Sequence, residues 1–326
     1  MRLAVLDDWQ GVAERSADWS ALAARGVAVS FFAAPLRGAD EAAAALADFD
    51  FLIVMRERMA VPAALLARLP KLRMISLTGR RSPVLDVEAC TRQGVLVCNT
   101  GGELSSAATA ELAVGLLIGA MRHMPVGDAA ARAGRFQGGV PEGTALEGKT
   151  LGVIGLGRIG ARVARVGAAL GMRVLGWSAN LTPERAAEAG ATRVEKARLL
   201  EESDAVSLHL VLSDRTRGVL GTDDLARMKP GAVLVNTSRF PLVDEAALIA
   251  ALQARRITAA LDVFPEEPLP PGHRLLACPN LVLTPHLGYC TREVYAQFYG
   301  DSIANVLAFL DGAPLRMMNP EALQRS

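Results

Sequence analysis

Hydrophobic and polar positions follow two spacings along this chain, and the change from one to the other recurs throughout it. Short apolar runs of strand length are followed by stretches in which apolar residues return at three- and four-residue steps, as in an amphipathic helix. This alternation predicts parallel strands covered by helices on both faces, which is an α/β architecture. The strands predicted in the first hundred residues are 2–6, 27–32, 51–54, 73–77 and 95–97.

A second alternating series follows, with predicted strands at 151–154, 172–177, 205–210, 232–236, 258–261 and 281–283. Two such series predict two doubly wound parallel-sheet domains, of the Rossmann or flavodoxin type, with a cleft between them. Long helices are expected at 103–123, ended by Pro125, and at 291–310. The last helix comes too late for the second sheet. We therefore expect a discontinuous substrate domain, 1–100 plus 290–326, a dinucleotide-binding domain, 101–289, and a hinge formed by the two long helices.

The most specific motif lies in residues 149–178, where an apolar run leads into Gly155, Gly157 and Gly160, spaced G-x-G-x-x-G. A helical pattern starts at Ile159. In this setting the first glycine allows a tight turn, the second lets the backbone approach a pyrophosphate, and the third packs helix against strand. The strand–loop–helix context predicts dinucleotide binding, with the phosphate on the free N–H groups of the helix.

Composition narrows the class of protein without changing the fold. The chain has 326 residues, of which 51% are hydrophobic and 21% charged, and its formal net charge is +1. This balance indicates neither disorder nor nucleic-acid binding. The longest uninterrupted apolar run, 112–121, is shorter than the roughly 18 residues that a membrane span needs. The first residues do not read as a signal peptide, and cysteines 90, 98, 278 and 290 lack metal-like spacing. We expect a cytoplasmic protein without a metal, membrane or nucleic-acid partner.

Three polar landmarks follow consecutive strands of the second series: Arg239, Glu267 and His286. Ligands of open α/β sheets bind beyond the carboxyl ends of strands, so these side chains can converge on one point. Arginine holds a carboxylate or a polarised carbonyl with its fork of donors, and histidine is an acid or base near neutral pH. A carboxylate on the far ring nitrogen orients the imidazole and favours its protonated form. His209, in an apolar strand, is interpreted as a satisfied core histidine.

The motifs GLGRIG, NTSR, LDVF..EP and TPH.G, in this order and spacing, resemble the D-isomer-specific 2-hydroxyacid dehydrogenase family over nearly the whole chain. The likeness is to its glyoxylate/hydroxypyruvate reductase-like or phosphoglycerate dehydrogenase-like branch. It implies a homodimeric enzyme that transfers hydride between NAD(P)(H) and a small 2-oxo acid or D-2-hydroxy acid. It also implies that Arg239 binds the substrate carboxylate and carbonyl, that His286 transfers the hydroxyl proton, and that Glu267 tunes this histidine.

The resemblance further implies two sets of binding residues. The cofactor set adds Arg158, Ile159, Thr237, Ser238, Asp262 and Gly288, with Asp262 at the nicotinamide end. The substrate set consists of Gly79, Arg80 and Arg81, in a loop whose amides grip the substrate carboxylate, and Tyr289.

Several residues depart from the usual pattern of the family. Arg80 and Arg81 replace small residues, which leaves open whether they select a substrate with extra negative charge or face water. Phe240 stands where a glycine normally follows the arginine, so it either alters the backbone beside Arg239 or narrows the pocket. Tyr289 replaces a small residue and is expected to touch the substrate. The segment 127–148 has no clear period, and the sequence leaves open a surface excursion or an oligomer contact.

The position that distinguishes the two nicotinamide cofactors is Ser178. An acid here accepts from the adenosine ribose 2′-hydroxyl and repels a 2′-phosphate, and this chain has none. The sequence therefore favours NADP(H) slightly, with NAD(H) possible. Two other functions remain open: a nucleotide-sensing, corepressor-like binding protein on the same fold, and a formate-type dehydrogenase. Glu267 stands where that last branch has glutamine.

Overall fold

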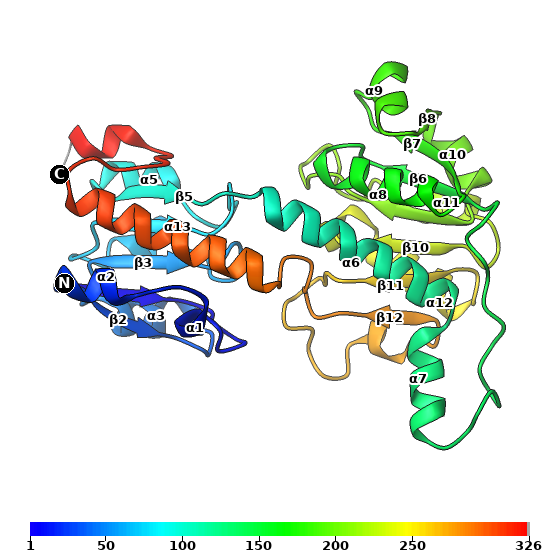
Figure 1. The fold of residues 1–326 in the computed structure, drawn as a ribbon, viewed down its shortest axis with the longest axis horizontal. Coiled ribbons are helices and arrows are strands. Elements are labelled where there is room, and N and C mark those ends of the chain that lie inside the picture. The colour runs from blue at the N-terminus through cyan, green and yellow to red at the C-terminus, as the bar shows by residue number, and fades with distance from the viewer. Residues whose placement is uncertain (325–326) are drawn as a thin grey trace. The chain divides into compact units, whose positions relative to one another are not determined.

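The computed structural model describes residues 1–324 and forms two α/β units (Figure 1). Unit 1 comprises residues 1–105 together with the chain from residue 290 onward, and unit 2 comprises residues 106–289. The first boundary therefore falls after Ser105, inside a long helix, whereas the sequence-based boundary falls after residue 100. The C-terminal helix belongs to unit 1.

Unit 1 is built on a five-stranded parallel sheet in the order β2-β1-β3-β4-β5. The strands are β1 (Arg2–Val5), β2 (Ala28–Phe31), β3 (Phe51–Val54), β4 (Met74–Leu77) and β5 (Leu96–Asn99). Its helices are α1 (Ala13–Ser16), α2 (Ser20–Ala24), α3 (Gly38–Leu46), α4 (Ala63–Leu66), α5 (Val87–Arg92) and α13 (Arg292–Leu310), with a 3-10 turn η3 (Pro320–Gln324). Because β3 is buried on both faces, it reads in the sequence as a continuous apolar run. Strand β4 is equally buried and has one polar residue, Ser76. Helix α13 packs on β4, where the hydroxyls of Ser76 and Ser302 lie 2.9 Å apart.

Unit 2 is built on a seven-stranded parallel sheet in the order β12-β11-β10-β9-β6-β7-β8. The strands are β6 (Thr150–Ile154), β7 (Arg173–Trp177), β8 (Thr192–Arg193), β9 (Ala205–Leu208), β10 (Val233–Asn236), β11 (Thr258–Leu261) and β12 (Leu281–Leu283). The helices are α6 (Glu103–Met121), which starts in unit 1, α7 (Met124–Arg132), α8 (Arg158–Ala169), α9 (Pro183–Glu188), α10 (Lys196–Glu202), α11 (Thr222–Arg227) and α12 (Glu245–Gln253), with 3-10 turns η1 (Phe240–Leu242) and η2 (Arg274–Ala277). The two-residue β8 is absent from the sequence-based strands.

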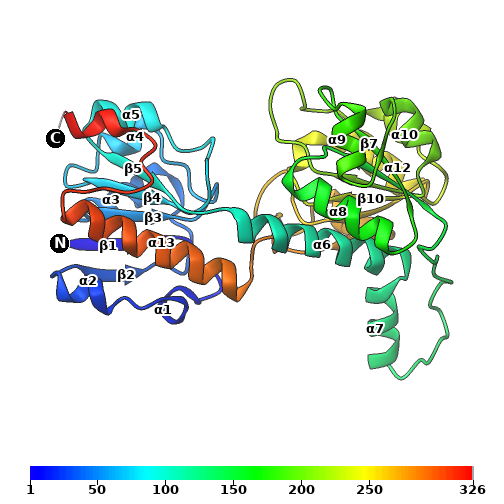
Figure 2. The same cartoon turned by 45° about the horizontal axis from the view of Figure 1, so that its top comes forward.

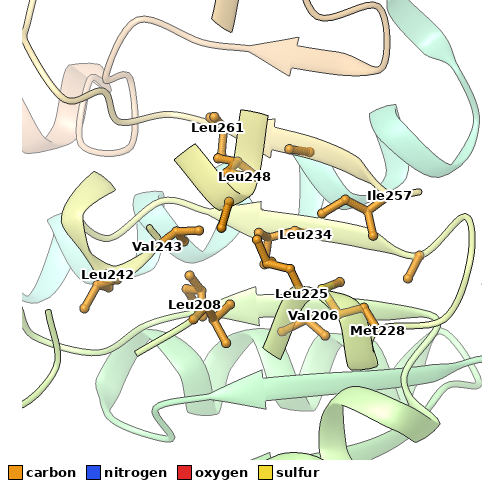
Figure 3. Packing of buried hydrophobic residues seen from close by; sticks show 14 of the residues in the cluster. Val206, Leu208, Leu225, Met228, Leu234, Leu242, Val243, Leu248, Ile257 and Leu261 are labelled. Atoms are coloured by element: carbon orange, nitrogen blue, oxygen red, sulfur yellow. The ribbon is translucent and has the colours of Figure 1, made fainter. Parts of the chain in front are cut away.

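Two apolar clusters hold the sheet of unit 2 in place. On one face, Leu208, Leu234 and Leu261 from adjacent strands pack beside Leu225 of α11 and Leu248 of α12 (Figure 3). On the other face, a second cluster contains strand residues together with α6 and α8. Burying this much apolar surface on both sides fixes the strand ends, from which the polar site residues project.

Helix α6 is apolar from Leu112 to Met121, whereas its first half carries polar residues that include Glu103 and Glu111. It is 19 residues long, has an 18-residue window of mean hydropathy 1.6, and is thus able to cross a membrane by length and composition. The sequence-based prediction rests only on the uninterrupted apolar run 112–121, so it does not identify this longer hydrophobic window. However, 56% of that window is buried, and Ala113, Leu117 and Ala120 belong to the core cluster of unit 2. A core helix of a globular domain has the same composition, so this is weak evidence for a span.

The segment after α6 differs from the sequence-based expectation. Pro125 is expected from the sequence only to end the long helix. In the structure it stands in the first turn of the next helix, α7, where a proline loses no helical hydrogen bond. His123, in the left-handed region with φ 50°, separates the two helices. Helix α7 and the loop to residue 148 extend away from the sheet of unit 2 (Figures 1 and 2). Phe136 in this excursion is 88% exposed.

Candidate active site

The glycine loop joins β6 to α8 at the point where the chain reverses its course through the sheet. Strands β7 and β8 lie on one side of β6, and β9 to β12 lie on the other. Gly155 has φ +99°, and a side chain there would come within 2.7 Å of the carbonyl carbon of His209. A side chain at Gly160 would overlap the carbonyl oxygen of Gly155. Both positions therefore require glycine for the fold itself.

Gly157 differs from its two neighbours, because a Cβ there would meet no heavy atom within 4 Å. Gly157 directly precedes α8, whose first two residues are Arg158 and Ile159. The first N–H groups of a helix have no partner within it, and they carry the positive end of the helix dipole. The open face at Gly157 and these donors fit a pyrophosphate, as the sequence predicts.

These three glycines permit a matched test of the cofactor site. We expect Gly157→Ala to weaken NADH and NADPH binding by about tenfold or more, because the methyl group occupies the face that the pyrophosphate approaches. Its thermal unfolding should match the wild type. We expect Gly160→Ala to lower the free energy of unfolding by about 1–3 kcal/mol through overpacking. Fluorescence titration and thermal denaturation measure the two effects, and unchanged affinity in Gly157→Ala would contradict the assignment.

Three adjacent strands of unit 2 end beside one another and supply the predicted catalytic residues. Arg239 follows β10, Asp262 and Glu267 follow β11, and His286 follows β12. The strands are parallel and in register, with Asn236 opposite Leu261 and Leu261 opposite Leu283. Their carboxyl ends therefore meet at the same edge of the sheet, where open α/β sheets bind ligands.

His286 and Glu267 form a close pair. The distance between His286 Nδ1 and Glu267 Oε2 is 2.5 Å, and the two side chains are 21% and 31% exposed. Burial acts to raise the pKa of Glu267, but the hydrogen bond and charge of His286, the backbone N–H of Phe264 and the charge of Arg239 together lower it. The carboxylate is thus ionised at neutral pH and holds one ring nitrogen of His286.

Asp262 holds the segment that carries His286. Its Oδ1 accepts hydrogen bonds from the Leu287 N–H at 2.7 Å and the Thr284 hydroxyl at 2.6 Å, and its Oδ2 accepts from the Gly288 N–H at 2.9 Å. The residue is completely buried, and this burial raises its pKa against the lowering effect of these partners. His286 itself has φ +55°, a backbone conformation that needs such support.

The sequence-based role of Asp262 is contact with the nicotinamide. In the structure its carboxylate instead accepts hydrogen bonds from the 284–288 segment. Its observed role is to anchor the loop, which sequence reasoning missed, and the cofactor contact stays a prediction. Gly288 is likewise buried. A Cβ there would come within 3.1 Å of Asp262 Oδ2 and 3.2 Å of Thr109. Its glycine is thus explained by close packing, and its place beside the cofactor also stays a prediction.

Arg239 sits on a loop shaped by Asn236. The completely buried Asn236 donates from Nδ2 to the Arg239 carbonyl at 3.1 Å and accepts from the Ser238 N–H at 3.0 Å. The half-buried guanidinium donates to the Ser238 carbonyl at 2.6 Å, and its charge reaches Glu267. Ser238 donates to the Leu208 carbonyl at 3.0 Å, while Thr237 is only 6% exposed. The NTSR motif therefore places Arg239 and Glu267 in one electrostatic site.

Phe240 is a core residue of unit 2. It is 3% exposed and packs in the core cluster of unit 2. It is not among the residues with positive φ, so glycine is not required there, and Arg239 has ordinary extended angles of −143° and 137°. The expectation that Phe240 narrows the pocket is wrong, because the side chain packs in the core, and its effect on the backbone relative to glycine stays a prediction.

His209 differs from its sequence-based interpretation as a satisfied core histidine. It follows β9 and lies against Gly155, at the crevice beside β6. Its Nε2 lies 2.9 Å from the Ser207 hydroxyl, but its buried Nδ1 has no hydrogen-bond partner among residues 1–324. Burial lowers the pKa of His209 to about 3, so the ring is neutral. Its position directly after an apolar strand is the sequence signal for a place at the crevice.

The predicted substrate residues are divided between the units. In unit 1, Gly79 has φ +87° and donates to Thr100 Oγ1 at 2.7 Å, while Arg80 and Arg81 are exposed. In unit 2, Tyr289 is 3% exposed and packs edge-on against His286, with 5.7 Å between ring centroids. Tyr289 therefore supports the imidazole, and its contact with substrate stays a prediction.

Two further predicted features concern the cofactor and metals. Ser178 follows β7 and is half-buried, and no acid stands beside it before Glu184. Within residues 1–324, no group of three histidine, cysteine, aspartate or glutamate side chains is arranged to hold a metal ion.

Comparisons with known proteins agree with this geometry. Residues 114–288 match the family model described as D-isomer specific 2-hydroxyacid dehydrogenase, NAD binding domain. The chain is 41% identical over 269 residues to a glyoxylate reductase from Aeropyrum pernix, covering 80% of each chain. It is 35% identical to a D-3-phosphoglycerate dehydrogenase from Archaeoglobus fulgidus, covering 81% of this chain but 50% of that one. A crystal structure of a phosphoglycerate oxidoreductase from Vibrio cholerae superposes with a TM-score of 0.89 at 38% identity, covering 96% of this chain and 100% of that one.

Proposed function

Because this chain belongs to the D-isomer specific 2-hydroxyacid dehydrogenase family, we propose that it reduces a small 2-oxo acid, with glyoxylate or hydroxypyruvate as the favoured substrates. The family assignment makes it an oxidoreductase that uses a nicotinamide cofactor and acts on 2-oxo and 2-hydroxy acids. The glyoxylate reductase matches it over most of both lengths, whereas the phosphoglycerate dehydrogenase is about twice as long as the matching part. Length alone does not separate the two substrate classes, because the phosphoglycerate oxidoreductase from Vibrio cholerae is covered completely. The higher identity to the glyoxylate reductase, 41% against 35% for the phosphoglycerate dehydrogenase, supports the smaller substrates.

The observation that carries the proposal is the 2.5 Å contact between His286 Nδ1 and Glu267 Oε2. An ionised carboxylate holds Nδ1 of His286. We therefore assign proton transfer to Nε2 of the protonated imidazole, which donates its proton to the alkoxide that develops on the substrate. Arg239 binds the substrate carboxylate and polarises its carbonyl. Asp262 keeps the 284–288 segment in place. A bound nicotinamide supplies the hydride, and the open face at Gly157 with the first N–H groups of α8 fits its pyrophosphate.

A substrate panel tests this function directly. Loss of NADPH or NADH absorbance is followed with glyoxylate, hydroxypyruvate, pyruvate and phenylpyruvate in turn. Turnover of glyoxylate or hydroxypyruvate supports the proposal. Turnover of other 2-oxo acids alone would contradict the substrate assignment, and silence on the whole panel would favour a nucleotide-sensing protein. The comparisons offer no support for that alternative.

The cofactor preference is open to a charge test at Ser178. We propose NADP(H) as the slightly preferred cofactor. An acid at this position accepts from a ribose hydroxyl and repels a 2′-phosphate, so Ser178→Asp should lower the NADPH-to-NADH ratio of kcat/KM by about tenfold. The exposed Asn180 provides a matched control, because Asn180→Asp adds the same charge two residues away. Equal ratios in Ser178→Asp and wild type would refute this role.

We also propose a cytoplasmic homodimer, with the excursion from α7 to residue 148 as its contact. The four cysteines form no disulfide within the described residues 1–324, in keeping with a reducing compartment. Met124 and Phe136 are 57% and 88% exposed in the excursion. We expect Phe136→Asp to halve the mass measured by light scattering, because it places a charge in an apolar contact. Val211→Asp, at an equally exposed apolar residue elsewhere in unit 2, should retain the wild-type mass.

A further inference from the structure

A second site lies in unit 1, at the point where its sheet reverses direction. In the order β2-β1-β3-β4-β5, the chain proceeds to one side of β1 and then continues on the other side with β3. Sheets of this order bind ligands in the crevice beyond the carboxyl ends of those two central strands. A cavity of about 210 Å³ occupies that position, lined by residues after β1, residues after β3, and the first turns of α3 and α4.

The cavity has a buried floor and an exposed mouth. Asp7, Ala42 and Leu65 line the floor and are 3%, 2% and 1% exposed. The exposed Gly38 and Ala39 line the mouth. Most of the lining is apolar, and no residue of the Gly79 segment or of unit 2 contributes to it. The cavity therefore uses none of the residues to which the proposed reaction is assigned.

Asp7 is the unusual residue of this cavity. It has φ +57°, a conformation that residues other than glycine adopt rarely and that accompanies functional sites. Its Oδ1 accepts from Trp9 Nε1 at 3.2 Å, whereas its buried Oδ2 accepts no hydrogen bond from residues 1–324. Burial raises the pKa of this carboxyl despite the Trp9 bond and the charge of Arg58. A buried acceptor without a donor is unfavourable, so the site has a strong preference for a donor on a ligand.

Arg58 donates a hydrogen bond to the backbone of Asp7, while its charge also acts on the Asp7 carboxyl. Its Nη1 donates to the Asp7 carbonyl at 3.0 Å, and its guanidinium lies 4.9 Å from the centroid of the Trp9 ring. The loops after β1 and β3 are thereby tied together around the cavity. This makes a preformed polar corner in an otherwise apolar pocket, the composition typical of small-molecule sites.

We propose that this cavity binds a small apolar molecule with one hydrogen-bond donor, an alcohol or an amine, whose donor bonds to Asp7 Oδ2. An apolar cavity of about 150 Å³ holds benzene, so this one holds a ring with a short substituent, or about eight non-hydrogen atoms. Such a group belongs either to the tail of a 2-oxo acid or to a separate effector.

A pair of isosteric probes tests the polar part of the proposal. Benzyl alcohol carries the donor, and toluene lacks it. In ligand-observed NMR titrations of the full chain, both should bind saturably in about the millimolar range or tighter. Benzyl alcohol should bind about tenfold more tightly, the effect of one hydrogen bond to a buried charged group. Non-saturable binding, or equal affinity for the two probes, would overturn the proposal.

Asp7→Gly separates the donor contact from the cavity, because glycine adopts φ +57° without strain. In this variant, toluene should still bind and the advantage of benzyl alcohol should disappear. If benzyl alcohol keeps its tenfold advantage, Asp7 is not its acceptor and the proposal fails.

Larger side chains in the cavity lining test whether the probes bind in this cavity. Ala39→Leu places a larger side chain at the exposed rim with little risk to folding, and it should remove binding of both probes. Ala42→Leu should have the same effect from the floor. Ala44→Leu is the matched control, because Ala44 is an exposed residue of α3 outside the cavity lining. Wild-type affinity in both filling variants would overturn the assignment.

Inhibition kinetics distinguish the two sources of the ligand once binding is shown. Competition between benzyl alcohol and the 2-oxo acid would assign the site to the substrate tail. Inhibition or activation that is not competitive would assign it to an effector. Both outcomes retain the ligand chemistry proposed for Asp7.

Discussion

Replacing His286 with asparagine is expected to lower kcat by about 10²–10⁴-fold, the usual contribution of a general acid or base. Asparagine keeps a similar size and tolerates the left-handed backbone that His286 adopts, so the 284–288 segment should retain its bonds to Asp262. Steady-state reduction of glyoxylate or hydroxypyruvate measures the loss. Cofactor affinity, measured by fluorescence titration, should remain close to wild type.

The chain supplies a matched control for this variant. His273 lies in the same unit, is 22% exposed and also pairs with a glutamate, Glu245, at 3.1 Å. It is the N-cap residue of η2, where its side chain accepts a hydrogen bond from the Leu275 N–H. His273→Asn should leave kcat near the wild-type value. Equal activity in His286→Asn and His273→Asn would rule out the proposed acid.

The same pair has a pH signature. The pKa of Glu267 is lowered in the folded protein, so its ionised form contributes stability above its ordinary pKa, and that stability is lost as pH falls through the lowered value. The pair is therefore intact at neutral pH. Glu267→Gln removes this ionisable group. The excess in free energy of unfolding of the wild type over Glu267→Gln should therefore be largest at neutral pH and shrink as pH falls through the lowered pKa of Glu267, as measured by urea denaturation at several pH values. A difference that does not change with pH would contradict the pairing of Glu267.

Arg239→Ala is expected to lower kcat/KM by about 10³-fold, because the substrate carboxylate and the developing negative charge both lose a planar fork of donors. Arg239→Lys should recover only part of this loss, since an ammonium is a point charge without the bidentate geometry. The measurement is kcat/KM with the best substrate of the panel, beside cofactor titration, which should change little.

A control arginine tests whether removal of any positive charge from this unit lowers kcat/KM. Arg274 is an exposed residue of η2 in the same unit, and Arg274→Ala should keep the wild-type kcat/KM. Retention of more than about a tenth of the activity in Arg239→Ala would argue against direct substrate binding.

The sequence by itself determined the two α/β series, the strand ends and the chemistry that follows them. Buried parallel strands appear as apolar runs, and this local signal locates β10, β11 and β12 to within a residue or two. The positions of Arg239, Glu267 and His286 follow, because parallel neighbours end at one edge. The glycine spacing similarly predicts the loop before α8. The constraint on Gly160 is local, because it comes from the Gly155 carbonyl, whereas Gly155 is also constrained by the distant His209.

Only the tertiary structure decided which way individual side chains turn and what they hold. Asp262 anchors residues more than twenty positions later, Phe240 enters the core, and Asp7 closes a cavity with residues from α3 and α4. None of these contacts has a periodic signature, because each depends on the packing of segments that are distant in the chain. Hydrophobic spacing reports which face of an element is buried, whereas the partner of a buried polar group is set by the three-dimensional arrangement around it.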